Sequence, residues 1–274
     1  MKTVSDHGWQ VVGTSRQNLT DGLLRYDSDE NGEFNRLLDR TEPDAVVYSS
    51  AWTWVDGCES NPDKADLHNA QHPAESAKVA NQNGVRFVFL STSYVYDGKK
   101  RVYTEADVPN PLNVYGKSKL RGEELVAQNT GGKALIIRTM GVYGIESKRK
   151  NFLYSVYDKV GRGEKIQVPM DQFGNFTFAG DLAQGIMKLL SESQEGIWNI
   201  AGPDPTACRF DLAQEICRVF ALNEDLVQPI SSENLGQSAL RPTFAGLSNE
   251  KMVRMFDYKP RTLPEFQAEL DSAL

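Results

Sequence analysis

Val85-Arg86-Phe87-Val88-Phe89-Leu90-Ser91-Thr92-Ser93 is the stretch of the sequence that decides the fold. Its first six residues are mostly apolar, and three hydroxyl side chains follow them directly. A short and continuously apolar run is typical of a parallel strand that is buried on both faces of its sheet. Ligands of such sheets bind at the carboxyl ends of the strands, so the hydroxyl residues are site candidates.

The same pattern recurs before and after this stretch. We expect further strands at residues 10–13, 44–48 and 134–137, and helices at roughly 30–40, 62–83 and 114–129. Strands that alternate with amphipathic helices indicate a parallel sheet covered by those helices. Residues 1–146 therefore predict an α/β fold, a Rossmann-like parallel sheet flanked by helices.

The rhythm of the sequence changes after residue 146. We expect helices at 151–160, 181–190 and 210–220 and a strand at 196–200, followed by short helices with Pro and Gly breaks. This part, residues 147–274, is predicted to be mainly a smaller C-terminal substrate-binding lobe. Within it, residues 180–202 are expected to return to the Rossmann-like sheet.

Composition and charge narrow the class of protein. The formal net charge of −7 argues against binding to nucleic acid. No apolar run approaches roughly 18 residues, so no membrane span is expected, and the first residues lack the apolar core of a secretory signal. The three cysteines (Cys58, Cys208 and Cys217) have no metal-ligand spacing, which favours a reducing, cytoplasmic location.

The three histidines (His7, His68 and His72) do not predict a metal site. His68 and His72 have the i,i+4 spacing of two ligands on one helix face. However, Pro73 follows directly, and no carboxylate pattern accompanies the pair in the sequence. The sequence therefore predicts no bound metal.

The strongest chemical signal is Tyr115-Gly116-Lys117-Ser118-Lys119. Tyr115 and Lys119 are four positions apart on a predicted helix, so their side chains lie on one face. A phenol has a pKa near 10 and is a poor proton donor and acceptor at neutral pH. A nearby ammonium group lowers that pKa toward the working range. The same lysine can hold the ribose hydroxyls of a nicotinamide nucleotide.

A Tyr-x-x-x-Lys match is weak by itself, as Tyr96 and Lys100 in a loop of this chain illustrate. Tyr115 differs because a turn precedes its helix and because it follows, by 23 residues, the cluster of hydroxyl residues at the end of the best strand. A hydroxyl beside the tyrosine can donate a hydrogen bond to a substrate carbonyl and stabilise charge on its oxygen. A surface Tyr–Lys pair beside a serine-rich turn is the plainer alternative.

Several stretches in the right order carry a resemblance to a known family. Residues 91–98, 103–107 and 111–123 (PLNVYGKSKLRGE) are similar to dTDP-4-dehydrorhamnose reductases, of the extended short-chain dehydrogenase/reductase class. They also resemble a relative of these enzymes, the regulatory subunit of methionine adenosyltransferase. The likeness covers nearly the whole chain, through residues 51–59, 69, 137–144, 151–152, 171–174, 181–183 and 241–242.

The resemblance implies a role for each matching residue. Thr92, Tyr115 and Lys119 are the implied catalytic residues, and Asn69 either completes a proton relay or is structural. The residues expected to contact the cofactor are Ser15, Arg16, Asp27, Ser49, Ser50, Ala51, Tyr115, Lys119 and Arg138. The residues expected to contact the substrate are Trp54, Val55, Thr92, Asn151, Gln172 and Arg241.

The cofactor choice depends on residues 14–16, which follow the first predicted strand. NAD-selective folds place an acidic residue there, whereas Ser15 and Arg16 suit a 2′-phosphate, so NADP(H) is favoured. Arg16 could also be an ordinary surface residue.

Two features depart from the family. Phe176 replaces a proline, which affects the expected sugar pocket. Family members begin with a strand, a glycine-rich turn and a helix, and no such turn occurs anywhere in the 274 residues. We therefore expect a sheet without its central strand, and either an incomplete copy of a normal enzyme or a degenerate member.

Two hypotheses of different classes follow. The first is NADPH-dependent reduction of a nucleotide-linked 4-keto-6-deoxy sugar, by resemblance dTDP-4-dehydro-L-rhamnose. The second is a non-catalytic regulatory or binding subunit. The first predicts a nucleotide-sugar as substrate, and both leave open a homodimer or a partner subunit.

Overall fold

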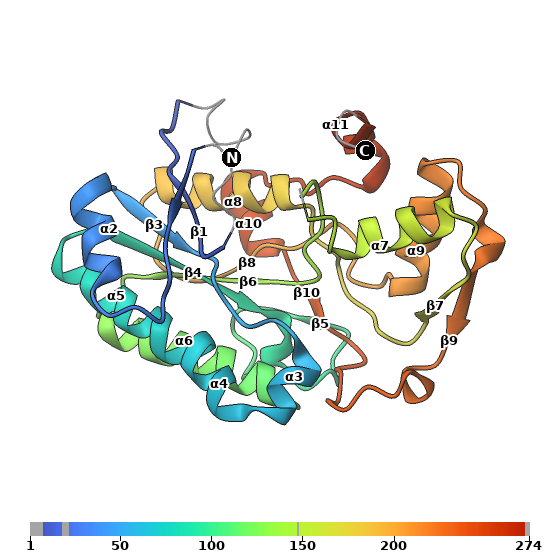
Figure 1. The fold of residues 1–274 in the computed structure, drawn as a ribbon, viewed down its shortest axis with the longest axis horizontal. Coiled ribbons are helices and arrows are strands. Elements are labelled where there is room, and N and C mark those ends of the chain that lie inside the picture. Colours follow the sequence, from blue (N-terminus) through green and yellow to red (C-terminus); the bar gives the residue numbers. More distant parts are fainter. Residues whose placement is uncertain (1–7, 18–21, 147, 272–274) are drawn as a thin grey trace.

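The computed structural model describes residues 8–17, 22–146 and 148–271. Figure 1 shows two unequal parts side by side, a larger one built on a sheet and a smaller one that carries α7, α9, β7 and β9. The chain passes between them several times, so neither part is one continuous segment.

The larger part is built on a four-stranded parallel sheet with the order β3-β4-β6-β8. Its strands are β3 (Ala45–Tyr48), β4 (Arg86–Thr92), β6 (Leu135–Thr139) and β8 (Gly196–Asn199). The register pairs Phe89 with Ile136 and Ile137 with Trp198, so large apolar side chains lie at matching heights. The predicted α/β fold with a parallel sheet is confirmed.

Alternating side chains of the strands bury the two faces of this sheet. Phe87 and Phe89 point to one face, where they pack with α2 (Glu33–Thr41), α5 (His72–Gln82) and α6 (Val114–Asn129). Val88 points to the other face, which α8 (Ala179–Ser191) and α10 (Glu250–Phe256) cover. Figure 1 shows α8 along one side of the sheet and α5 and α6 along the other.

The N-terminal strands form a separate sheet. β1 (Gly13–Ser15) pairs in parallel with β2 (Leu23–Arg25), a strand that the sequence analysis did not identify. Among the described residues β3 pairs with β4 alone, so one edge of the main sheet has no strand beside it. Val47 on β3 is 44% exposed, although apolar runs of this kind are normally covered. This arrangement agrees with a sheet that lacks its central strand.

The smaller part has its own apolar core. α7 (Phe152–Gly161) and α9 (Arg209–Val219) pack around Leu153, Val156 and Ile216, beside the parallel pair β7 (Ile166–Pro169) and β9 (Val227–Ile230). A second parallel pair, β5 (Val102–Tyr103) with β10 (Gly246–Leu247), joins loops that are far apart in the sequence. β8 and most of α8 fall within residues 180–202, and both belong to the layers of the main sheet.

The remaining elements are short. They are the helices α3 (Val55–Ser60), α4 (Pro62–Asp66) and α11 (Gln267–Asp271), a π-helical turn (Leu67–Gln71), and 3-10 turns at Ser93–Val95, Glu224–Leu226, Ser232–Leu235 and Leu263–Phe266. None of the helices in the described ranges has both the length and the apolarity needed to cross a bilayer.

Candidate active site

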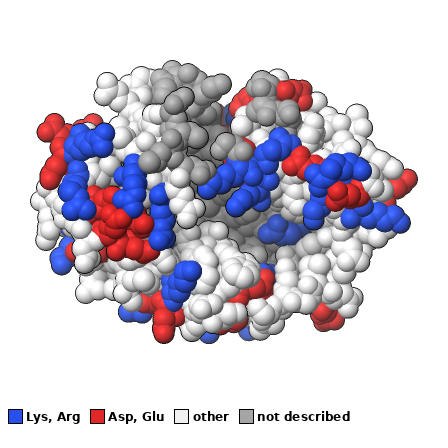
Figure 2. All heavy atoms as spheres, viewed as in Figure 1, with Lys and Arg blue, Asp and Glu red and all other residues white. Residues whose placement is uncertain are grey.

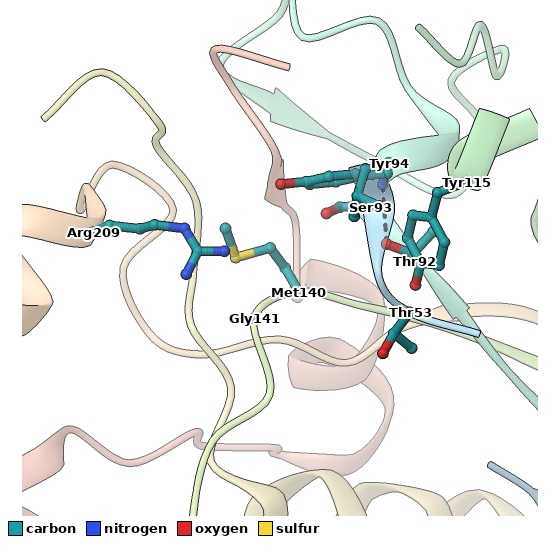
Figure 3. Close-up of a pocket in the computed structure, with 9 residues that line it drawn as sticks. Thr53, Thr92, Ser93, Tyr94, Tyr115, Met140, Gly141 and Arg209 are labelled. Atoms are coloured by element: carbon teal, nitrogen blue, oxygen red, sulfur yellow. Dashed lines mark hydrogen bonds between the residues drawn. The ribbon is translucent and has the colours of Figure 1, made fainter. Parts of the chain in front are cut away.

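A pocket of about 170 Å³ opens at the carboxyl ends of β4 and β6. Its wall is formed by Thr53, Val55, Thr92, Ser93, Tyr94, Tyr115, Met140, Gly141 and Arg209. Figure 3 shows the hydroxyl groups of Thr92 and Tyr115 on one side and the Arg209 guanidinium on the opposite side. The pocket therefore combines hydroxyl groups that can reach a carbonyl with a cation at the far end.

Thr92 and Tyr115 come together because the chain turns tightly after β4. The Tyr94 amide donates to Thr92 Oγ1 at 3.2 Å and starts the 3-10 turn Ser93–Val95. The first turn of α6 packs directly on this 3-10 turn, since a Cβ on Gly116 would lie 2.1 Å from the Tyr94 carbonyl oxygen. Asn113 caps α6 by accepting from the Gly116 amide at 2.8 Å. The glycine thus lets Tyr115 approach the strand end.

The environment of Tyr115 differs from the expected one. Burial raises the pKa of the Tyr115 phenol above its ordinary value, and the Thr92 hydroxyl acts in the opposite direction. The lowering of this pKa expected from Lys119 is therefore not found in this arrangement. The phenol is therefore protonated at neutral pH. It can act as a proton donor but not as a base.

Lys119 lies beneath the pocket rather than in its wall. Its side chain is 2% exposed, its Nζ donates to the Leu90 carbonyl oxygen at 2.5 Å, and it lies 3.9 Å from the Phe89 ring centroid. Burial lowers the pKa of Lys119 to about 7, against the opposing effect of Glu123. The ammonium is thus held by β4, one turn of α6 away from Tyr115.

Arg138 does not lie at a cofactor surface, and this part of the prediction is wrong. It is 2% exposed, and its guanidinium donates to both carboxylate oxygens of Glu123, at 2.9 and 2.5 Å. Its remaining nitrogen donates to the Tyr96 hydroxyl at 2.6 Å. A buried guanidinium is stable only with such partners, so this pair links β6 to α6 inside the core.

Asn69 is fully buried in the π-helical turn and is held by three hydrogen bonds. Its Oδ1 accepts from the Trp52 amide at 2.8 Å, and its Nδ2 donates to the Trp52 carbonyl at 3.1 Å and to Ser118 Oγ at 3.0 Å. These bonds tie the loop after β3 to α6. They favour the structural alternative for Asn69 over a proton relay.

The residues expected to contact the substrate are separated by the structure. Val55 lines the pocket, whereas Trp54 beside it is 66% exposed. Arg241 forms a bidentate ion pair with Asp56, at 2.9 and 2.7 Å, which lowers the pKa of that carboxyl well below its ordinary value. The guanidinium is therefore committed to a structural contact between the two parts of the chain.

Asn151 and Gln172 lie in the smaller part. Asn151 precedes α7 and donates to the Gly144 carbonyl at 2.7 Å, and its buried Oδ1 has no partner among the described residues. The Gln172 amide donates to Ser232 Oγ at 2.8 Å and to Gln237 Oε1 at 3.0 Å. Asn151 thus keeps a free acceptor, while the Gln172 nitrogen is engaged within the protein.

Five of the residues expected to contact the cofactor lie at the carboxyl ends of β1 and β3, and a sixth, Asp27, is buried just after β2. Ser49 and Ser50 are exposed just after β3, with Ala51 partly exposed beside them. Ser15 ends β1, and Arg16 follows it with a 52% exposed side chain. Arg16 is not a free cation, because it contacts Asp27 at 3.0 Å and Asp29 at 2.7 Å.

Arg209 is the main pocket residue that the sequence analysis missed. It opens α9, and its guanidinium lies 5.5 Å from the Phe152 ring and 5.7 Å from the Phe176 ring. Phe176 also packs beneath Gly141, so the residue that replaces the family proline supports this end of the pocket. The sequence signal that could have identified Arg209 was a basic residue at the start of a predicted helix.

Figure 2 shows the surface hollowed between the two parts, with basic side chains on the rim over the smaller part.

The chain is similar to known proteins over most of its length. Residues 1–274 match the family model described as the RmlD substrate binding domain. The chain belongs to this family. It is 38% identical over 238 residues to the dTDP-4-dehydrorhamnose reductase of Burkholderia thailandensis, covering 81% of this chain and 78% of that protein.

Other members are similar over most of their length. The structure of dTDP-4-dehydrorhamnose reductase from Bacillus anthracis in complex with NADP superposes with a TM-score of 0.83 at 25% identity. That match covers 94% of this chain and 93% of the other. Methionine adenosyltransferase 2 subunit beta of Xenopus laevis is 27% identical over 263 residues, covering 93% of this chain and 77% of that protein. The proteins similar to this chain thus include reductases and one named as a subunit.

Proposed function

We propose that this protein reduces a nucleotide-linked 4-keto-6-deoxy sugar, of the dTDP-4-dehydro-L-rhamnose type, with NADPH. The observation that carries the proposal is the pairing of Thr92 and Tyr115 in one pocket, with Arg209 at its other end. A carbonyl between the two hydroxyls would accept their hydrogen bonds, and a cation at the far end suits an anionic nucleotide group.

The chain's own residues account for the proton side of such a reduction. When bound, NADPH supplies the hydride for C4 of the sugar. Tyr115 donates its phenolic proton to the carbonyl oxygen, which becomes the C4 hydroxyl, while Thr92 holds that oxygen in place. Lys119, one turn further along α6, is the cation to which we assign stabilisation of the phenolate that remains, once its ammonium leaves the Leu90 carbonyl.

The chain offers polar groups for the ribose of the cofactor but no glycine-rich turn for its pyrophosphate. Ser49 and Ser50 are exposed just after β3, and the buried Ser93 Oγ in the pocket wall has no partner among the described residues. The first two hydroxyls suit the hydroxyls of a ribose, and Ser93 suits a polar group of the sugar. For the pyrophosphate, the 274-residue sequence offers no glycine-rich turn. A preference for NADPH over NADH rests on Arg16 and stays a prediction.

The direct test is an assay of the purified chain with dTDP-4-dehydro-L-rhamnose and millimolar NADPH, because binding at micromolar concentration is expected to be too weak to measure. The expected result is oxidation of NADPH with formation of one C4 hydroxyl per hydride, identified by mass spectrometry of the deoxysugar nucleotide. NADPH consumption without a reduced sugar, or no turnover when NADPH is shown to be bound, would contradict the proposal.

A second candidate function is a non-catalytic regulatory subunit. It is favoured by the similarity to methionine adenosyltransferase 2 subunit beta. Its test is co-purification of the folded chain with a catalytic partner whose activity it changes. A homodimer and a cytoplasmic location likewise stay predictions.

A further inference from the structure

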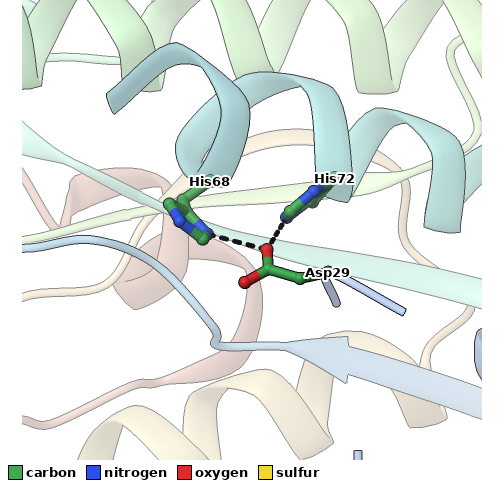
Figure 4. Close-up of side chains that lie close together, drawn as sticks. All are labelled: Asp29, His68 and His72. Carbon is green, nitrogen blue, oxygen red and sulfur yellow. Dashed lines mark ion pairs between the residues drawn. The ribbon is translucent and has the colours of Figure 1, made fainter. Parts of the chain in front are cut away.

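Three ligand-type side chains converge outside the pocket. Asp29 lies in the loop after β2, His68 in the π-helical turn and His72 at the start of α5. Figure 4 shows both imidazoles directed at one oxygen of the Asp29 carboxylate. The Nδ1 atoms of both histidines lie 3.7 Å from Asp29 Oδ1, and the three ligand atoms lie within 4.8 Å of one another.

These distances fit a shared metal ion better than direct hydrogen bonds. An N–H···O hydrogen bond is about 2.7–3.2 Å long, so 3.7 Å is too long for one. Ligands bonded at about 2.0–2.1 Å in a tetrahedron lie about 3.3 Å apart, so small side-chain movements complete the geometry. The two rings are 5.2 Å apart and nearly perpendicular, at 83°, which keeps them from clashing around a common centre.

One ring nitrogen of the cluster is available for a ligand. The buried Nδ1 of His72 has no hydrogen-bond partner among the described residues. A neutral imidazole with an unpaired ring nitrogen is the form that binds a metal.

The charges around the cluster leave one carboxylate oxygen available. Arg16 Nη2 contacts Asp29 Oδ2 at 2.7 Å, so the guanidinium orients the carboxylate and Oδ1 faces the histidines. Asp27 adds a second negative charge nearby through the same arginine. Lys64 opposes a cation, but its ammonium is directed at the Trp52 ring, 4.6 Å from its centroid.

We propose that Asp29, His68 and His72 bind a divalent transition-metal ion of the zinc class, with water as the fourth ligand. Two imidazoles and one carboxylate favour zinc or cobalt over magnesium or calcium, which prefer oxygen ligands. The ion would fasten the loop after β2 to the helix that carries Asn69. It would also fix Arg16, which shares Asp29 with the metal.

The test uses the full chain without a histidine tag, freed of metal and titrated with zinc chloride by calorimetry. We expect one zinc per chain, and loss of at least about a hundredfold in affinity for His72→Ala and for Asp29→Asn, since even outer-shell changes cost ten- to a hundredfold. His7→Gln is the matched control and keeps full affinity. Circular dichroism checks that each variant is folded. The Asp29 side chain is 36% exposed, so Asp29→Asn should fold and tests the metal site even if His72→Ala does not fold.

Two spectra identify the ligands. The chain has three histidines, so imidazole nitrogen NMR resolves each ring, and zinc is expected to shift two of the three. The cobalt form should have tetrahedral absorption bands without a thiolate charge-transfer band, which excludes the three cysteines. Equal zinc affinity in the parent and both variants, or unshifted imidazole signals at saturating zinc, would overturn the proposal.

Discussion

The phenol of Tyr115 is the single group on which the proposed chemistry depends most. We expect Tyr115→Phe to abolish keto-sugar reduction while the fold is kept, because phenylalanine retains the ring that packs against Tyr94 but carries no proton. Turnover and thermal unfolding of the purified variant test this. Tyr157→Phe, on α7 against Phe220, is the matched control and should leave turnover unchanged. Parent-like turnover by Tyr115→Phe would show that another group supplies the proton.

Lys119 predicts a pH dependence of stability. Its pKa is about 7 in the folded protein and 10.5 ordinarily, so between these values the unfolded chain binds one more proton than the folded chain. By linkage, the free energy of unfolding contributed by this residue increases as the pH rises from 7 toward 10. Urea titrations from pH 7 to 9 should give a steeper increase for the parent than for Lys119→Met. Parallel curves would mean that the lysine stays charged when folded.

Arg16 predicts cofactor selectivity. We expect Arg16→Ala to weaken NADPH binding much more than NADH binding, because only NADPH carries the 2′-phosphate that a guanidinium can grip. Its contacts with Asp27 and Asp29 reduce the size of this effect, since the phosphate must compete with two carboxylates. Titration of both cofactors up to millimolar concentration measures the ratio of the two losses. Equal losses for the two would leave Arg16 as a purely structural residue.

At the scale of elements, the contact between α6 and the 3-10 turn after β4 positions the site. Gly116→Ala is expected to lower the unfolding free energy and the turnover, although alanine is the better helix former, because its Cβ would meet the Tyr94 carbonyl. Gly161→Ala, at the end of α7 with no atom near its Cβ, should be neutral or stabilising by up to about 1 kcal/mol. Chemical denaturation of both variants makes the comparison. Equal effects would mean that the approach of α6 is not tight.

The sequence located most elements because their patterns are local. The predicted helix at 114–129 coincides with α6, and the strands at 44–48 and 134–137 coincide with β3 and β6 to within two residues. The first strand was predicted at residues 10–13, whereas β1 begins at the last of these residues and covers Gly13–Ser15. β2 was missed because three residues are too few for a period to appear.

At the scale of the whole molecule, β3 has an open edge and β1 pairs with β2 in a separate sheet among the described residues. We expect this chain to bind NADPH too weakly to measure at micromolar concentration, because its sequence has no glycine-rich turn, and the charge-assisted bonds of such a turn are worth about 1.5–3 kcal/mol each. A chain with a family-type strand, turn and helix fused before Lys2 should recover micromolar binding. Calorimetry compares the two. Tight binding by the unmodified residues would mean that another segment holds the pyrophosphate.

The sequence by itself determined the α/β class and the strand ends that carry the site, and it singled out Tyr115. These follow from apolar periodicity and from spacing along one strand and one helix, which are local properties of the chain. The choice of Thr92 among the hydroxyl residues after that strand came from the resemblance to the family. It also identified the family, which the comparisons confirmed over residues 1–274.

Only the tertiary structure decided the contacts between segments that are distant in the sequence. Arg138 was assigned to the cofactor, but folding places it against Glu123 in the core, where a buried charge must be paired. Arg209 reaches the pocket from a helix far along the chain. His68 and His72 lacked a carboxylate in the sequence, and the loop after β2 brings Asp29 to them. Such partners depend on which surfaces pack together, which no local period encodes.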